Sequence, residues 1–261
     1  MALNKNEFLE KFNTEVKRNM SQLSQKEQRY IRDKGNKIID LLLELENKNF
    51  LKDLSRSEAQ EIQNKKLKNV ILNHDHIKRL NQTFIKLVEN IKQGSPKTEV
   101  KLKDKCGNEY KITMNQIVTF LAWTYCSLCE VMLQFLSSII DFNKMNVRQP
   151  TGLGKLIYTL KYKQINVAFF EDIDTKVRNS FFHLDFRFSG KKVYCKHNPE
   201  IYKNKRLFPW RTQEDNNQSE YILLLDLLWL ALYADRSTYA TMHGVIYYLA
   251  KKSEPKFYID F

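Results

Sequence analysis

The chain has 261 residues, of which 43% are hydrophobic and 28% are charged, and its formal net charge is +13. The hydrophobic share is large enough to bury a core, which excludes a disordered tail. The excess of cations favours a polyanionic partner, with nucleic acid ahead of an anionic membrane. A lysine-rich background composition also explains this excess, so charge alone does not decide the function.

The N-terminal stretch 1–11 is polar and has no signal-peptide pattern, so we expect a cytoplasmic protein. Two apolar stretches, 117–140 and 221–233, have to be compared with membrane spans. The first carries Glu130 near its middle, and the second is too short and carries Asp226. Both are therefore predicted as buried helices, with no membrane as a partner.

Helical periodicity dominates the first part of the chain. Apolar residues at four-residue steps mark the first helix: Phe8, Phe12, Val16 and Met20. Ser55 and Glu58 have the spacing of a capping box, which predicts a further helix that ends at Gly94-Ser95-Pro96. Residues 1–96 are therefore predicted to form an N-terminal helical region.

Two short alternating patterns interrupt the helices and predict two small β-hairpins. Val100 and Leu102 precede the first turn, and Tyr110 and Ile112 follow it; the corresponding residues of the second are Phe186, Phe188, Val193 and Cys195. Long helices are predicted over 115–141 and 219–252. The expected fold is mainly α with one or two small hairpins, and residues 97–261 form the domain that carries the candidate site.

Neither cysteines nor histidines show a convincing metal-site pattern. Cys126 and Cys129 lie in an apolar helical pattern with no second pair at zinc-site spacing, so we expect core packing. His74 and His76 are two residues apart and point to different sides of a helix. His197 and His243 are expected to be structural or exposed. No metal and no cofactor are therefore expected.

The chemistry-bearing segment is Arg178-Asn179-Ser180-Phe181-Phe182-His183. Asn179 and His183 stand at i, i+4 and share a helical face. Arg178 precedes His183 by five residues, a rotation of about 140° on an ideal helix. One helix does not aim both side chains at one point. Either the long arginine bends around, or a second copy completes the site, which is a reason to expect a homodimer.

These residue types suit the cleavage of RNA without a metal. The 2′-hydroxyl is an internal nucleophile, so the enzyme needs a group that exchanges protons near neutral pH, as His183 does. The crowded phosphorane needs a cation, and the planar fork of Arg178 suits phosphate oxygens. Asn179 is expected to donate to phosphate or to orient His183. The products would be a 2′,3′-cyclic phosphate and a 5′-hydroxyl.

The segment R-N-x3-H, in a helix followed by a short extended stretch, resembles the R-polar-x3-H motif of the HEPN superfamily. That resemblance implies a HEPN-like helical bundle with an N-terminal helical extension. It also implies that Arg178 and His183 are the catalytic pair, with Asn179 as the polar residue, in a composite site of a homodimer. Many HEPN proteins are ribonucleases of toxin–antitoxin, abortive-infection and CRISPR-associated defence. A defence or toxin effector is therefore expected, with an antitoxin or regulatory protein as a further partner.

A basic segment follows the motif, and we expect it to bind the phosphates of RNA. Its cations are Lys191, Lys192, Lys196, Lys203, Lys205 and Arg206, and its aromatic residues Tyr194, Tyr202 and Trp210 are candidates for base stacking. A merely solvated basic loop is the alternative. Cations also gather at 65–68 and at Lys161 and Lys163, whereas Tyr158, Tyr162, Phe169 and Phe170 have spacings that suit a core.

The leading hypothesis is thus an endoribonuclease that cleaves single-stranded RNA. Its rival is a non-catalytic module that binds RNA or a protein, in which Arg178 and His183 serve structure. A subunit of a larger protein complex is a third alternative.

Overall fold

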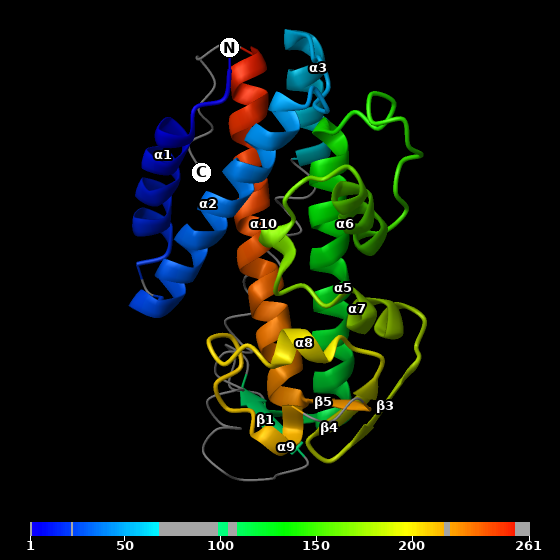
Figure 1. The fold of residues 1–261 in the computed structure, drawn as a ribbon. Coiled ribbons are helices and arrows are strands. Elements are labelled where there is room, and N and C mark those ends of the chain that lie inside the picture. Colours follow the sequence, from blue (N-terminus) through cyan, green and yellow to red (C-terminus); the bar gives the residue numbers. More distant parts are fainter. Residues whose placement is uncertain (1, 22, 68–98, 104–108, 217–219, 254–261) are drawn as a thin grey trace. The chain divides into compact units, whose positions relative to one another are not determined.

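The computed structural model describes the chain except residues 1, 22, 68–98, 104–108, 217–219 and 254–261 (Figure 1). The helices are α1 (Lys5–Asn19), α2 (Gln25–Asn47), α3 (Arg56–Glu61), α5 (Met114–Ile139), α6 (Leu153–Tyr162), α7 (Thr175–Phe182), α8 (Pro199–Tyr202), α9 (Gln213–Asn216) and α10 (Leu224–Ser253), with a short π-helix η1 (Ile62–Leu67) and a 3-10 helix η2 (Ala168–Phe170). The strands are β1 (Glu99–Lys103), β2 (Glu109–Thr113), β3 (Phe186–Ser189), β4 (Lys192–Cys195) and β5 (Tyr221–Leu223). The protein is mainly helical with small antiparallel sheets, which confirms the predicted class.

The chain divides into two compact units that interleave along the sequence. Unit 1 comprises Met1–Ile71, Cys129–Glu171 and Ala234–Phe261, and unit 2 comprises Leu72–Leu128 and Asp172–Tyr233. The long helices α5 and α10 each contribute residues to both units. The division into 1–96 and 97–261 stays a prediction.

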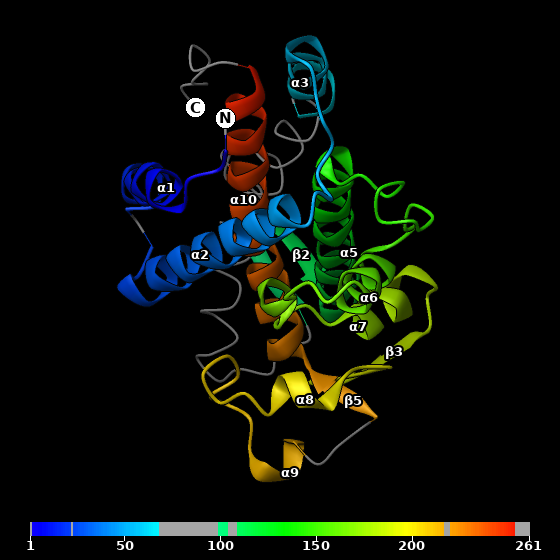
Figure 2. The same cartoon turned by 45° about the horizontal axis from the view of Figure 1, so that its top comes forward.

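In unit 1, α1 packs along α2 beside the C-terminal half of α10 (Figures 1 and 2). The predicted stripe is confirmed, because Phe8, Phe12 and Val16 are buried. The ring of Phe12 contacts His243 at 5.5 Å between centroids. Gly35 lets the ring of Phe12 lie close against α2, since a Cβ at position 35 would lie 2.2 Å from that ring.

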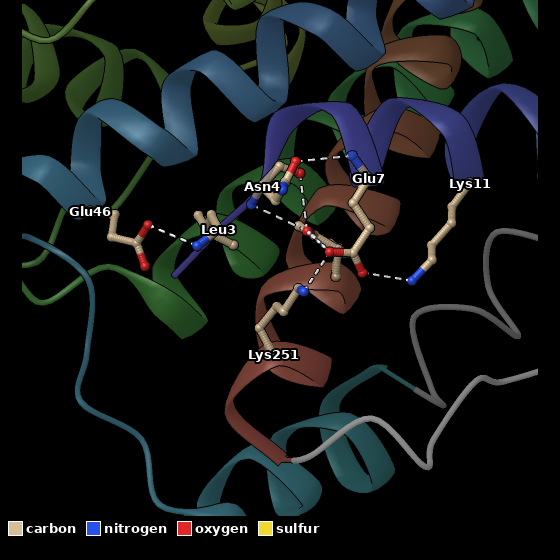
Figure 3. Close-up of polar contacts among 7 residues, drawn as sticks. Leu3, Asn4, Glu7, Lys11, Glu46 and Lys251 are labelled. Carbon is tan, nitrogen blue, oxygen red and sulfur yellow. Dashed lines mark hydrogen bonds and ion pairs between the residues drawn. The ribbon is translucent and has the colours of Figure 1, made fainter. Parts of the chain in front are cut away.

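Polar contacts join the start of α1 to the end of α10 (Figure 3). The carboxylate of Glu7 accepts hydrogen bonds from Lys11 Nζ at 2.7 Å, Lys251 Nζ at 2.5 Å and the Tyr247 hydroxyl at 3.1 Å. Chiefly the two lysines lower the pKa of Glu7 to about 2. The Leu3 amide donates to Glu46 of α2 at 3.1 Å, so the N-terminal segment is bonded to both α2 and α10.

Two further expectations fall in unit 1. The capping box at Ser55 and Glu58 is confirmed, and α3 begins there; the rest of the predicted helix toward 94–96 lies largely outside the described residues. The expectation that Tyr158 and Tyr162 are core residues is wrong, because their side chains are 72% and 69% exposed. Leu153, Leu156 and Leu160 form the buried face of α6, and the tyrosines lie on the other side of the helix.

In unit 2, both predicted hairpins are confirmed. Strands β1 and β2 pair antiparallel with Val100 opposite Ile112, and β3 and β4 pair with Phe188 opposite Val193. A third strand, β5, joins β4 through Val193 and Ile222. The prediction that the final helix covers this segment is wrong, because pairing with β4 takes the backbone groups of β5 and α10 begins only at Leu224.

Helix α5 is long and apolar enough to cross a membrane, judged by its length and composition alone. Of its most apolar window, 61% is buried inside the protein, which is compatible with a core helix of a soluble protein. Cys129 is buried and Cys126 is half-buried, and neither forms a disulfide, as expected for core packing.

Candidate active site

Asp174 fixes the start of α7, the helix that carries the candidate motif. Its Oδ1 caps the helix by accepting from the amides of Lys176 at 3.0 Å and Val177 at 3.2 Å. Its Oδ2 accepts from the amide of Asn198 at 2.7 Å and from the buried hydroxyl of Tyr202 at 3.1 Å. One buried carboxylate thus positions α7 against the segment after β4.

The body of α7 is held from two sides. The hydroxyl of Tyr125 on α5 donates to the carbonyl of Asp174 at 3.0 Å, and the thiol of Cys126 donates to the carbonyl of Arg178 at 3.4 Å. On the other side, the buried hydroxyl of Ser180 accepts from the amide of Lys196, just after β4, at 3.1 Å. The backbone of the motif is therefore anchored to both α5 and the β3–β4–β5 sheet.

Helix α7 ends in a Schellman motif with an unusual residue. The amide of Asp185 donates to the carbonyl of Ser180 at 2.7 Å, and the amide of Leu184 donates to that of Phe181 at 3.1 Å. Leu184 therefore takes the left-handed position, with φ of 58°, which glycine or asparagine normally occupies. Its side chain is 79% exposed, so no contact within the described chain explains the strain.

Arg178 and His183 both contact the ring of Phe182. The guanidinium carbon of Arg178 lies 4.5 Å from the ring centre. The imidazole of His183 stands edge-on to the same ring, at 5.4 Å between centroids and 89° between planes. These distances keep the guanidinium carbon and the imidazole centre within about 10 Å, a gap that one phosphodiester can bridge with a hydrogen bond of about 2.8 Å on each side.

Asn179 orients the arginine and not the histidine. Its Oδ1 accepts from Nη1 of Arg178 at 3.1 Å, while its amide nitrogen has no protein acceptor within the described residues. Arg178 itself is only 8% exposed, whereas Asn179 and His183 are exposed. Arg178 and His183 point in different directions around the helix, as predicted, but both contact the ring of Phe182. Phe182 was not among the predicted site residues.

The imidazole of His183 is in contact with solvent. It sits at the C-cap of α7, and across the part of the chain that the structure describes it forms no hydrogen bond to protein atoms. Both ring nitrogens are therefore available to a ligand. His197, in contrast, is buried with Nδ1 at 3.2 Å from the carbonyl of Cys195, so it serves structure as predicted.

The six cations of the predicted RNA-binding segment are all exposed: Lys191, Lys192, Lys196, Lys203, Lys205 and Arg206. Several already have partners. Lys196 lies 3.4 Å from Asp185, Lys203 lies 2.6 Å from Glu200, and Lys205 donates to the carbonyl of Arg211. The two ion pairs, of Lys196 and of Lys203, are exposed, so they are weak and can be exchanged for phosphate contacts.

The aromatic residues of that segment are less available than predicted. Tyr202 is fully buried and bonded to Asp174, so its expected role in base stacking is wrong. Trp210 is half-buried, donates to Asp226 at 2.8 Å and stacks on Trp229 at 5.4 Å. Tyr194 is half-buried, and Arg187 lies over its ring at 4.6 Å. Packing of the hairpin and the buried polar network takes up most of their faces.

Comparison of the chain with protein-family models, with curated proteins and with solved structures finds no match in any of the three. The chemistry of the site therefore has to be judged from its own residues. Among the described residues, no group of three or more His, Cys, Asp or Glu is placed to hold a metal ion, and His74 and His76 lie outside them.

The site offers three groups to a phosphodiester. His183 supplies a solvent-accessible imidazole, Arg178 supplies a permanent cation in a fixed orientation, and Asn179 supplies an amide donor. An imidazole can transfer a proton near neutral pH, and the guanidinium and amide can stabilise negative charge on phosphate oxygens. Because Arg178 is held by Asn179 and Phe182, little reorganisation is needed when a phosphate binds.

Proposed function

We propose that the chain is a metal-independent endoribonuclease that cleaves single-stranded RNA, with His183, Arg178 and Asn179 as catalytic residues. One observation supports this most: the Phe182 ring holds the arginine and the exposed histidine close enough to act on one phosphodiester. The resemblance of the segment to the HEPN motif points to the same chemistry.

In the proposed reaction, the 2′-hydroxyl loses its proton to a base and attacks the adjacent phosphorus. The bond from phosphorus to the 5′-oxygen then breaks, and that oxygen takes up a proton. The products are a 2′,3′-cyclic phosphate and a 5′-hydroxyl. His183 performs one of the two proton transfers, and Arg178 and Asn179 stabilise the charge of the phosphorane. The second transfer needs another group.

A second copy of the chain can supply that group, and we include a homodimer in the proposal. Phe182 and Leu184, on either side of His183, are 58% and 79% exposed, and Leu184 has a strained backbone. Exposed apolar side chains beside a candidate active site suit an isologous contact. The composite site would then contain two imidazoles, one as base and one as acid.

The HEPN resemblance extends the proposal to the biology of the protein. The enzyme would be a cytoplasmic defence or toxin effector with a HEPN-like helical bundle, and an antitoxin or another regulatory protein would restrain it.

The alternative is a module that binds RNA or a protein without catalysis. It is favoured by the burial of Arg178, because a guanidinium packed on Phe182 and bonded to Asn179 also serves to hold α7 together. The exposed cations after β4 would then bind phosphates in a protein that cuts nothing.

Cleavage assays with matched variants separate the two functions. We expect wild type and Lys176→Ala, a change of an exposed residue on the same helix, to cleave RNA in the presence of EDTA. His183→Ala should lower the single-turnover rate by about 100-fold or more, and Arg178→Ala by about 100-fold to 1,000-fold. Arg178→Lys keeps the positive charge but lacks the planar guanidinium group, so it tests the geometry of the cation in a variant that disturbs the fold less than alanine does.

Two results would count against the enzyme. Cleavage that stops on chelation and survives His183→Ala excludes this mechanism. Tight RNA binding without any cleavage by wild type favours the non-catalytic module.

A further inference from the structure

Helix α6 of unit 1 carries two exposed aromatic side chains on one face. Tyr158 and Tyr162 are 72% and 69% exposed, and they stand at i, i+4, about 6 Å apart along the helix axis. Neither ring contacts the other among the described residues, and both rings are largely exposed to solvent. The opposite face of α6 is buried through its leucines, which fixes the orientation of the helix in the unit.

The surroundings of these rings are cationic. Between 142 and 170 the sequence has no Asp or Glu, but it carries Lys144, Arg148, Lys155, Lys161 and Lys163. Lys155 lies on the same helical stripe as the tyrosines, and Lys163 Nζ lies 5.4 Å from the ring centre of Tyr162. Lys48 of α2 adds an ammonium at the C-terminal end of α6, where it donates to the carbonyls of Lys163 at 3.0 Å and Gln164 at 2.9 Å.

Exposed aromatic rings interleaved with cations fit single-stranded nucleic acid. Bases stack on aromatic side chains whatever their sequence, and lysines bind the backbone phosphates. The rise of about 6 Å between the two residues along the helix axis is close to twice the 3.4 Å rise per nucleotide of a stacked strand, so nearby bases of one strand can reach both rings. A membrane surface fits less well, because it needs exposed aliphatic residues and the leucines of α6 face inward.

Building on the RNA substrate of the proposed function, we propose that the face of α6 formed by Lys155, Tyr158 and Tyr162 is a binding site for single-stranded RNA, separate from the α7 motif in sequence. Bases stack on the two rings, and Lys155, Lys161 and Lys163 pair with phosphates. The site gives affinity and no chemistry, since α6 holds no side chain suited to proton transfer at neutral pH.

Binding is measured on the full chain carrying His183→Ala, so that cleavage does not interfere. The probe is a fluorescein-labelled uridine RNA of about 12 nucleotides, and the readout is fluorescence anisotropy. We expect Tyr158→Ala with Tyr162→Ala to weaken binding by about 25-fold or more, because each lost stacking contact lowers affinity by about fivefold or more. Tyr158→Phe with Tyr162→Phe keeps both ring faces and should change the Kd by less than about twofold.

Charge is tested by a second matched pair. Lys155→Gln with Lys161→Gln should lower the slope of log affinity against log salt by about 1.4, as expected for two lost contacts to single-stranded phosphates. Lys17→Gln with Lys26→Gln removes the same charge from exposed positions elsewhere in unit 1 and should leave the slope near that of the parent. Photocrosslinking with 5-iodouridine RNA should give adducts at Tyr158 or Tyr162.

An unchanged Kd in the alanine pair, or crosslinks that all map outside α6, overturns the proposal. Equal losses in the alanine and phenylalanine pairs also overturn it, since stacking does not need the hydroxyl. The proposal is also overturned if the alanine pair binds RNA as the parent does but loses binding to anionic lipid vesicles, because the face would then bind a membrane surface. Tyrosine-dependent binding by a wild-type protein that never cleaves RNA would refute only the nuclease. Cleavage and RNA binding that stay at the parent level in the alanine pair would refute only the α6 site.

Discussion

Loss of Asp174 should destabilise α7 more than any change to the catalytic side chains. The Asp174→Ala variant removes the N-cap of the helix and also the acceptor shared by the Asn198 amide and the Tyr202 hydroxyl. Tyr202 is fully buried, so water cannot replace the lost acceptor there.

The magnitude follows from these contacts. Removal of an N-cap costs about 1 kcal/mol, and each buried donor left without an acceptor costs about 1–3 kcal/mol. We therefore expect Asp174→Ala to lower the free energy of unfolding by about 4 kcal/mol, or the Tm by about 10 °C in a chain of this size. Asp174→Asn keeps the cap through Oδ1, but its NH2 group replaces Oδ2, which accepts from both the Asn198 amide and the Tyr202 hydroxyl, so its loss should be only about 1 kcal/mol smaller.

Thermal and urea unfolding followed by circular dichroism measure both variants. Asp185→Ala is the matched control, because it removes an exposed carboxylate at the other end of α7, whose partner Lys196 lies at 3.4 Å. That control should cost no more than about 1 kcal/mol. A loss below about 1 kcal/mol for Asp174→Ala would refute the role given to this carboxylate. Equal losses for Asp174→Ala and Asp174→Asn would contradict the contribution assigned to the N-cap bonds of Oδ1.

Three other outcomes are expected. Leu184→Asn relieves the left-handed backbone and should raise the free energy of unfolding by up to about 1 kcal/mol, while sedimentation velocity shows a weaker dimer and cleavage slows. Phe182→Ala should slow single-turnover cleavage at least about tenfold, because Arg178 and His183 lose their common support, whereas Phe182→Tyr should stay near wild type. Burial lowers the pKa of Lys34 from 10.5 to about 7, so between pH 7 and about 10.5 the unfolded chain binds more protons and stability should rise with pH. Lys34→Met should remove this rise in urea unfolding; a rise that persists contradicts the assignment to Lys34.

Local patterns predicted the elements that depend on local contacts. The stripe of Phe8 and Phe12, the capping box at Ser55 and the two hairpins all follow from the spacing of neighbouring residues. The helical wheel of α6 also contained the correct answer for Tyr158 and Tyr162, since the leucines at 153, 156 and 160 already mark the other face as buried.

Features that depend on distant residues were out of reach of the sequence. Strand β5 exists because the backbone of Ile222 pairs with Val193, and the hydroxyl of Tyr202 can be buried because it donates to Asp174. The motif spacing identified Arg178 and His183 as candidates but not the ring that joins them. The contact through Phe182 depends on side-chain rotamers, which no spacing encodes.

The chemistry of the cut ends tests the central claim most directly. Wild-type protein is incubated in EDTA with an RNA oligonucleotide and with its 2′-O-methyl counterpart, and the products are identified by mass spectrometry. Attack by the 2′-hydroxyl predicts 2′,3′-cyclic phosphate and 5′-hydroxyl ends from the RNA and no cleavage of the 2′-O-methyl strand. Fragments with 5′-phosphate ends, or cleavage of the 2′-O-methyl strand, would contradict it.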